Sequence, residues 1–223
     1  MRNIVVGTFL SLDGVMQAPG GPEEDPTGGF VHGGWSVNYW DDLMGQQMGQ
    51  QLGKPFDLLL GRKTYEIFAA HWPYVTNDPA AEALNRATKY VVSTTLDKAA
   101  WRNSILIRPG EREVPEQIRR LKQQDGPEIQ VHGSGRLIQT LIKHDLIDRY
   151  RLWLFPVLLG SGKRLFADGT IPAGLRLVDS KTSTTGVIMA TYERAGEITY
   201  GSFAFEQPTE AEVERRRRLA EQQ

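Results

Sequence analysis

The chain has 223 residues, of which 40% are hydrophobic and 24% are charged, and its formal net charge of −1 gives no electrostatic reason to expect nucleic acid as a partner. No apolar run approaches the roughly 20 residues of a membrane span, and the N-terminus lacks the basic and then apolar pattern of a signal peptide, so we expect a cytoplasmic protein without a membrane partner. The sequence contains no cysteine, which excludes disulfides, thiolate nucleophiles and cysteine–zinc sites.

The first quarter of the chain predicts one strand, one long loop and one weak helix. Residues 3–15 are rich in β-branched and apolar side chains and end at Asp13-Gly14, which predicts a buried strand followed by a turn. Residues 17–34 hold six glycines and three prolines, and a loop of this length is often a functional lid. Residues 35–52 carry apolar side chains near helical spacing, although their glycines weaken the pattern.

Strands and helices then alternate as far as residue 146. Hydrophobic periodicity distinguishes the two, because strands repeat every second residue and helices every three or four. Strands are expected at residues 56–61, 87–96, 104–109 and 128–133, and helices at residues 62–72, 114–124 and 134–146.

After residue 146 the sequence predicts mostly strands. They are expected at 148–159, in a hairpin over 175–195 that turns near Thr185-Gly186, and at 198–206. This order predicts an α/β fold with a mostly parallel central sheet and an antiparallel C-terminal hairpin. We find no repeat and no interior linker, and therefore expect one domain over residues 1–206 followed by a charged C-terminal tail at 207–223.

Three of the predicted strands end in groups suited to an anion. The strand 56–61 leads into Gly61 and then into a helix whose first turn offers free N–H groups. Ser93 and Thr94 follow a second strand, and a glycine-bracketed turn at 133–135 follows a third. If the strands are parallel, these ends lie along the carboxyl edge of the sheet, which is where open α/β sheets bind ligands.

Each of these motifs also has a plain structural explanation. Cations after Gly61 can be solvated, and the hydroxyls of Ser93 and Thr94 can form turns. The turn at 133–135 fails the Rossmann fingerprint, because its third glycine position is Ile138. His132 is more typical of a hydrogen-bonding residue than of a catalyst, and the remaining histidines show no metal-ligand spacing.

The ordered motifs resemble a known family. The stretches GRKTYE, VVST, VHGSGRLIQTLI and DRYRLWLFPVLLGSGKRLF are similar to the dihydrofolate-reductase-like fold, and in particular to the reductase domain of the bacterial riboflavin-synthesis deaminase–reductase and its stand-alone relatives. The resemblance covers roughly residues 3–195. It implies a three-layer α/β domain and NADPH as the cofactor. A deaminase module cannot be present, because its zinc signature requires cysteine.

The resemblance also implies which residues bind the cofactor. The phosphates would be held after the second strand, the 2′-phosphate end after the third, and the nicotinamide would lie near the first strand. The residues for the phosphates are Gly61, Arg62, Lys63 and Thr64, and those for the 2′-phosphate end are Ser93 and Thr94. The pyrophosphate and nicotinamide side would be held by Gly133, Ser134, Gly135, Arg136 and Leu137. The residues beside the nicotinamide would be Phe9, Met16 and Gln17.

Two acidic residues are candidates for catalysis. Asp13 is most simply a turn residue, but it stands at the end of the first strand and can reach substrate or cofactor. The predicted helix after the lid offers Asp41 and Asp42, of which Asp41 is taken as the candidate, because true dihydrofolate reductases carry their substrate-binding carboxylate on the helix after the lid. The acidic lid itself, with Glu23, Glu24 and Asp25, differs from what a phosphorylated riboflavin precursor would require.

These observations predict an NADPH-dependent oxidoreductase that reduces a small planar heterocycle, such as a pterin or ribosylaminopyrimidine, or a related C=N or C=O compound. A nucleotide-binding protein without turnover, such as a ligand sensor, is the alternative from another class. We also expect a homodimer, because the strand 148–159 carries large side chains on both faces and an exposed apolar patch usually has a partner.

Overall fold

A mostly parallel sheet of eight strands organises the molecule, in a computed structural model that describes residues 1–110 and 113–222. The strand order is β4-β3-β2-β5-β1-β6-β8-β7. The first six strands in this order, from β4 to β6, pair in parallel with their neighbours, and β8 pairs antiparallel with both β6 and β7. The predicted parallel sheet with an antiparallel C-terminal hairpin is therefore confirmed. The strands are β1 (Ile4–Ser11), β2 (Phe56–Gly61), β3 (Lys89–Val92), β4 (Ser104–Ile107), β5 (Glu128–Val131), β6 (Arg149–Phe155), β7 (Leu175–Thr182) and β8 (Ile188–Arg194).

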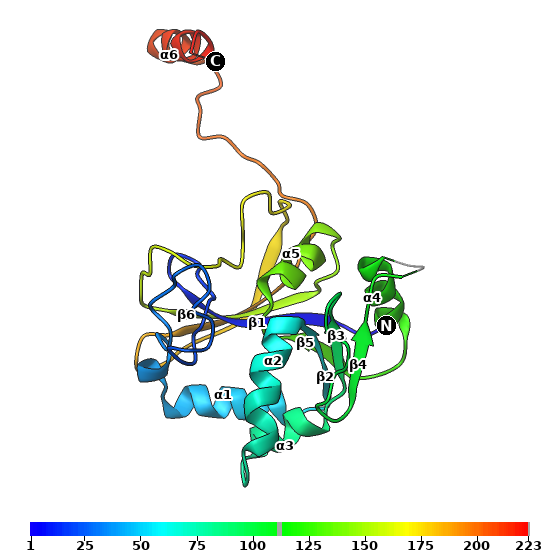
Figure 1. Ribbon diagram of the computed structural model, residues 1–223. Helices are drawn as coiled ribbons and strands as arrows, with labels where there is room; N and C mark the ends of the chain where they lie inside the picture. The colour runs from blue at the N-terminus through cyan, green and yellow to red at the C-terminus, as the bar shows by residue number, and fades with distance from the viewer. Residues whose placement is uncertain (111–112, 223) are drawn as a thin grey trace.

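Helices cover both faces of this sheet and produce three layers (Figure 1). One face carries α1, α2 and α3, and the other carries α4 and α5. The helices are α1 (Asp42–Leu52), α2 (Arg62–His71), α3 (Pro79–Arg86), α4 (Val114–Gln123), α5 (Gly135–Lys143) and α6 (Glu210–Ala220), with short 3-10 turns η1 (Val37–Tyr39) and η2 (Trp72–Tyr74).

Helix α3 has no counterpart among the predicted elements. Its start nevertheless carries a clear signal, because the Asp78 side chain accepts a hydrogen bond from the Ala81 N–H and Pro79 occupies the first turn. An acidic N-cap followed by proline is typical of a helix start. The eight residues of α3 are too few for periodicity alone to reveal the helix.

Side chains of β1 alternate between two cores. Ile4, Val6 and Leu10 pack with α4 and α5, whereas Phe9 packs on the opposite face with Trp153 and Phe155 of β6. The period of two along a pleated strand produces this division. As a result, β1 and β6 together form a floor between the helical layers.

The carboxyl ends of β2, β3 and β5 meet at one edge of the sheet, as expected for parallel neighbours. Gly61 pairs with Val92, and Leu58 pairs with Gln130, so continuing the second register by three residues places Gly61 beside Gly133. The three strand ends predicted to suit an anion, after β2, β3 and β5, therefore lie side by side.

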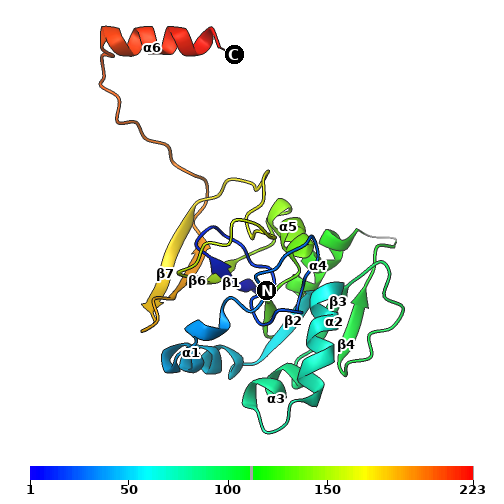
Figure 2. The same cartoon turned by 60° about the vertical axis from the view of Figure 1, so that its left-hand side comes forward.

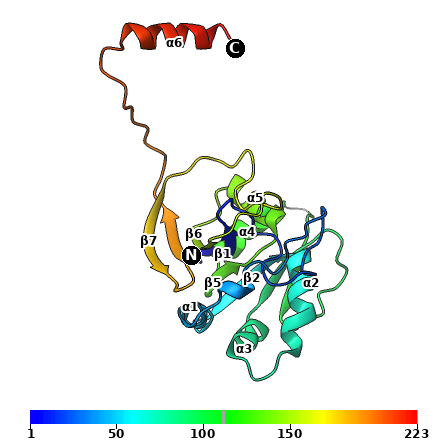
Figure 3. The same ribbon diagram turned by 90° about the vertical axis from the view of Figure 1, so that its left-hand side faces the viewer.

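Two expectations from the sequence are wrong in the described chain. The segment 35–52 is divided into η1 and α1, because Asp41 caps a new helix start there. The segment 198–206 forms no strand; it runs out from the domain and leads to α6, which stands apart from the rest in three views (Figures 1, 2 and 3).

Candidate active site

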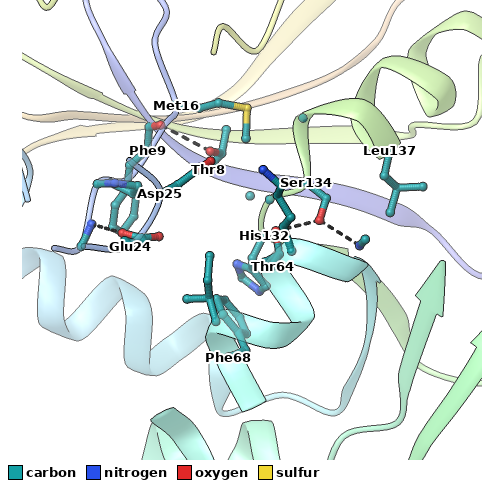
Figure 4. Close-up of a pocket in the computed structure, with 18 of the residues that line it drawn as sticks. Thr8, Phe9, Met16, Glu24, Asp25, Thr64, Phe68, His132, Ser134 and Leu137 are labelled. Atoms are coloured by element: carbon teal, nitrogen blue, oxygen red, sulfur yellow. Dashed lines mark hydrogen bonds between the residues drawn. The ribbon is translucent and has the colours of Figure 1, made fainter. Parts of the chain in front are cut away.

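A single large cavity of about 1280 Å³ opens at the carboxyl edge of the sheet, between α1, α2 and the loop 17–36 (Figure 4). Its volume exceeds the roughly 300–1,000 Å³ of an ordinary small-molecule pocket and suits a cofactor together with a second ligand. The fourteen residues predicted to bind the cofactor all line it: Phe9, Met16, Gln17, Gly61, Arg62, Lys63, Thr64, Ser93, Thr94, Gly133, Ser134, Gly135, Arg136 and Leu137.

Ser134 joins the first and third junctions. Its Oγ accepts a hydrogen bond from the Gly61 N–H at 2.8 Å and donates one to Thr64 Oγ1 at 2.7 Å. A Cβ on Gly61 would lie 2.6 Å from this same Oγ, which no real side chain tolerates. Glycine at position 61 is therefore required by the contact between the two junctions, in addition to any ligand.

The glycine-bracketed turn has its unusual backbone angle at the central residue. Ser134 has a φ of 71°, in the left-handed region, whereas Gly133 and Gly135 both have ordinary negative φ values. A Cβ on Gly133 would press on Thr64 Oγ1 at 3.1 Å, but a Cβ on Gly135 would meet no described heavy atom within 4 Å. The backbone of Gly135 therefore faces open space in the cavity, where a ligand can approach it.

The starts of α2 and α5 fit an anionic ligand. Among the described residues no side chain caps either helix, so their first N–H groups are available, and the dipoles of both helices favour negative charge there. Exposed cations surround these starts, namely Lys63, Arg136 and Arg62, whose pairing with Glu66 at 3.3 Å is a weak surface contact. This donor set suits the pyrophosphate and the additional phosphate of NADPH.

The second junction combines a turn and an open hydroxyl. Ser93 Oγ accepts hydrogen bonds from the backbone N–H groups of Thr95 and Leu96, at 3.2 and 2.9 Å, so the turn-forming alternative is correct for this side chain. Thr94 is exposed at the mouth of the cavity and leaves its hydroxyl accessible there.

Three aromatic rings form one wall of the cavity away from the helix starts. Phe9 stacks on Trp153 with ring centroids 5.2 Å apart, and Trp40 lies 5.5 Å from Trp153 and 5.8 Å from Phe9. Stacked and tilted rings of this kind provide a flat apolar surface. A planar heterocycle is the ligand shape that such a wall accommodates best.

Gln17 fixes the loop 17–36 as a lid over that wall. Its Nε2 donates to the carbonyls of Asp25 and Thr27 at 2.8 and 2.9 Å, and its Oε1 accepts from the Lys163 N–H at 3.0 Å. Its own carbonyl accepts from the indole N–H of Trp35 at 2.8 Å. Gln17 therefore lines the cavity as the residue that holds the lid.

The lid brings the Glu24 carboxyl group into the cavity. Its Oε2 accepts the Gly20 N–H at 2.6 Å, and burial raises the pKa of this carboxyl above its usual value (Figure 4). The neighbouring Asp25 differs, because the Lys163 ammonium and Thr27 hydroxyl bind its carboxylate, and its pKa is lowered. The pKa values of these two adjacent acids are thus shifted in opposite directions.

His132 lies in the floor of the cavity beside a half-buried ion pair. Its Nε2 is 2.8 Å from Gln130 Oε1, and Arg151 binds Glu128 through two contacts of 2.7 and 2.8 Å. Burial, and then the positive charge of Arg151, lower the pKa of His132 to about 4. His132 is therefore neutral at physiological pH and serves as a hydrogen-bonding residue, as its position on the strand indicated.

The structure places both predicted catalytic acids, Asp13 and Asp41, outside the cavity. Asp13 accepts hydrogen bonds from Ser11 Oγ at 2.6 Å and from the Gly160 N–H at 2.8 Å, and these bonds lower its pKa to about 2. Asp41 caps α1 through the Met44 N–H at 2.9 Å. Both carboxylates are occupied with holding the backbone, so the geometry assigns them structural roles.

The sequence did not predict that Glu24 would point into the cavity or that Trp153 would form part of its aromatic wall. The signal for Glu24 was present, since the lid of 17–34 carries three consecutive acids, but their orientation depends on Gln17. Within residues 1–110 and 113–222 we find no cluster of three His, Cys, Asp or Glu side chains that could hold a metal ion. Nor does the described chain contain a helix long and apolar enough to cross a membrane.

Comparison with known proteins identifies the family to which the chain belongs. A family model described as the RibD C-terminal domain matches residues 2–189. The Bacillus subtilis protein YyaP, which carries no functional name, is 28% identical over 204 residues, covering 87% of this chain and 96% of YyaP. A second such protein from the same organism, YwjB, is 32% identical over 188 residues, covering 81% of this chain and 91% of YwjB.

Solved structures share the fold at low sequence identity. A pyrimidine reductase-like protein from Corynebacterium diphtheriae has a TM-score of 0.59 and 13% identity, covering 88% of this chain and 93% of its own. A dihydrofolate reductase from Enterococcus faecalis, solved in complex with NADP(H), has a TM-score of 0.54 and 14% identity, covering 86% of this chain and 96% of its own. The predicted dihydrofolate-reductase-like fold is confirmed.

Gly135→Val tests whether the bare turn binds the cofactor. The new side chain would occupy open space that faces the cavity, so we expect NADPH affinity to fall more than tenfold, or about 1.4 kcal/mol, while the melting temperature changes little. Gly45→Val in α1 is the matched control, because a Cβ there also meets no described atom within 4 Å but lies outside the cavity. Unchanged NADPH affinity in Gly135→Val would reject the phosphate cradle.

His132→Gln tests the neutral histidine through the pH dependence of stability. The folded pKa of about 4 lies below the ordinary value of 6.5, so the unfolded chain binds the proton first as the pH falls. We therefore expect the wild type to lose stability between pH 6.5 and about 4 relative to the variant, and the two to run parallel above pH 7. Parallel denaturation midpoints across the acidic range would contradict a buried neutral His132.

Proposed function

Because the chain belongs to the RibD C-terminal domain family, we propose that it is an NADPH-dependent reductase that transfers a hydride to a small planar heterocycle. The observation that carries this proposal is that one cavity combines a phosphate-binding end with an aromatic wall beneath a closed lid. A protein that only bound the nucleotide would need the first part alone. The second part provides room for a substrate ring.

The cofactor's phosphates are assigned to the starts of α2 and α5 and to the cations around them. Lys63 and Arg136 supply positive charge, and Thr94 offers a hydroxyl at the second junction, after β3. When bound, NADPH supplies the hydride, so the chain itself has to position the reactants, exclude water and deliver a proton. Phe9, Trp40 and Trp153 orient the ring, and the lid held by Gln17 covers it.

Glu24 is our candidate for the proton donor. Reduction of a C=N or C=O bond adds a hydride to carbon and a proton to the nitrogen or oxygen, and the carboxyl of Glu24 supplies that proton and regains one from solvent. Its burial favours the protonated form, which is the form that donates. Asp25 is unsuited to this role, because Lys163 keeps it ionised.

The charges at the substrate end favour a ring without a phosphate group. The two cations that line this part of the cavity are already neutralised, Lys163 by Asp25 and Arg151 by Glu128. A phosphate placed there would meet the acidic lid without an unpaired cation. We therefore propose an uncharged or cationic heterocycle, in contrast to a ribosylaminopyrimidine phosphate.

Cofactor titration and a substrate panel test this function. We expect NADPH to bind at least tenfold more tightly than NADH, because one charge-assisted phosphate contact contributes about 1.5–3 kcal/mol. We also expect NADPH oxidation with at least one pterin or unphosphorylated aminopyrimidine. Lys63→Gln should reduce the preference for NADPH, whereas Lys98→Gln, an exposed residue outside the cavity, should preserve it. Tight NADPH binding without oxidation by any compound would favour the ligand-sensor alternative.

Glu24→Gln tests the proton donor separately from cofactor binding. We expect kcat to fall by about 10²–10⁴-fold while the NADPH dissociation constant is unchanged, because the variant keeps the shape of the side chain but cannot donate a carboxyl proton. The wild-type rate should decline as the pH rises through the raised pKa of Glu24, and this decline should be missing in the variant. Glu23→Gln, an exposed lid residue outside the cavity lining, is the control. Equal rates in Glu24→Gln and Glu23→Gln would refute the assignment.

A further inference from the structure

The imidazole of His132 belongs to a network of hydrogen bonds that uses only one of its two nitrogens. His132 Nε2 is 2.8 Å from Gln130 Oε1, and Gln130 Nε2 donates to Glu128 Oε1 at 3.1 Å. Arg151 binds the same Glu128 carboxylate through both of its terminal nitrogens. The network therefore runs from Arg151 to His132 along the floor of the cavity.

This network determines which nitrogen of His132 carries the proton. The Glu128 carboxylate, paired with Arg151, accepts hydrogen bonds only, so the Gln130 amide turns its NH₂ group toward Glu128 and its oxygen toward His132. An amide oxygen also accepts only, which requires a proton on His132 Nε2. Because burial lowers the pKa of His132 to about 4, the ring is neutral at physiological pH and has a single N–H. Nδ1 therefore presents a lone pair.

The Nδ1 atom is open to the cavity. No described residue forms a hydrogen bond with it, and Ser104 Oγ is the one buried side-chain N or O atom without a partner in residues 1–110 and 113–222. Nδ1 is thus unpaired but accessible, and His132 lies among the residues that line the cavity (Figure 4). A ligand in the cavity meets an acceptor there, which only a donor group can satisfy.

Gly7 leaves a notch in the floor beside this acceptor. Val6 pairs with Val131, so the next residue of β1, Gly7, lies beside His132. On its other side Gly7 pairs with Arg151. A Cβ on Gly7 would lie 3.7 Å from both Nδ1 and Cε1 of His132, so this edge of the imidazole borders the space that the missing side chain leaves. Gly7, His132 and Arg151 all line the cavity.

The notch continues into the aromatic wall that we assign to the substrate ring. Phe9 follows Gly7 by two residues on β1, and Trp153 follows Arg151 by two residues on β6, so these side chains lie on the same face of the sheet as the notch. Two residues of a strand span about 7 Å, so a ring stacked on the wall brings its edge over the notch. The helix starts assigned to the phosphates follow β2 and β5 instead.

We propose that His132 Nδ1 accepts a hydrogen bond from an amino group of the substrate and thereby selects amino-substituted heterocycles. This inference rests on the proposed function, which assigns the aromatic wall to the substrate. A carbonyl or methyl group at the same place would leave Nδ1 without a donor, and an unpaired polar atom that a ligand covers weakens binding. Arg151 cannot replace it from the other side of the notch, because a guanidinium has donors only and Glu128 binds both terminal nitrogens.

Two variants remove the acceptor by different routes. Gly7→Ala places a methyl group at ordinary contact distance from Nδ1 and leaves the network intact, and the φ of Gly7 is outside the left-handed region. His132→Gln keeps a donor toward Gln130 but has no atom at the position of Nδ1. Gly49→Ala in α1 is the control, because a Cβ there meets no described atom within 4 Å and the residue does not line the cavity.

Calorimetric titration of the full chain, saturated with NADP⁺, tests the selection. Pterin and isocytosine are compared with pteridin-4-one and pyrimidin-4-one, which are the same rings without the 2-amino group. We expect the wild type and Gly49→Ala to bind the amino compounds about tenfold more tightly, and Gly7→Ala and His132→Gln to bind both members of each pair equally. The NADPH dissociation constant should be the same in all four proteins, which shows that each is folded.

Three outcomes would overturn the proposal. A wild type that binds both members of each pair equally, or binds none of the compounds, does not use this acceptor. A preference that survives in both variants belongs to another residue. Weaker NADPH binding in both variants would assign Nδ1 to the carboxamide of the cofactor. By contrast, an intact preference without any NADPH oxidation would contradict the proposed function alone, because the titration requires no turnover.

Discussion

The hydroxyl group of Ser134 is the contact on which the candidate site depends. It bonds the Gly61 N–H and Thr64 Oγ1 at once, and so ties the β2–α2 junction to the β5–α5 junction. This is possible only because positions 61 and 133 have no Cβ, since one at 61 would overlap Ser134 and one at 133 would press on Thr64. Two helix starts are thereby brought together, and their N–H groups and dipoles act on one region of space. The glycine turn comes late in the chain because it completes a site that the earlier junction begins.

Much of this arrangement could be predicted from local sequence. Parallel strands have their carboxyl ends on one side, so glycine, hydroxyl and basic residues after three strands were enough to predict which residues line the end of the cavity where two helices start. The substrate end could not be predicted in the same way. The position of Glu24 depends on Gln17, whose side chain bonds the backbone of Lys163, a contact between residues far apart in the sequence. Asp13 and Asp41, the predicted catalytic acids, lie outside the cavity lining, because an acid at a turn or helix start is usually needed by the backbone itself.

The C-terminal third shows a second limit of sequence patterns. Alternation of apolar residues predicts that a segment can form a strand, but it contains no information on which edge the strand will join. Residues 198–206 have that capacity and remain unpaired in the described chain, whereas the large side chains of β6 are buried on both faces by the chain itself, which the alternation within the strand does not show. A strand's partner is decided by chain connectivity and by which edges are still open.

The way the lid is held has a kinetic consequence. Gln17 is only 4% exposed, and its amide joins the lid backbone at two carbonyls to the loop that carries Lys163. These three bonds share one side chain, so opening the lid at this point requires Gln17 to give up its contacts on both sides. Ligands that lie beneath the lid enter and leave only after that step. In the proposed reaction, the frequency of lid opening would therefore set an upper limit on turnover, however fast the bond-forming step is.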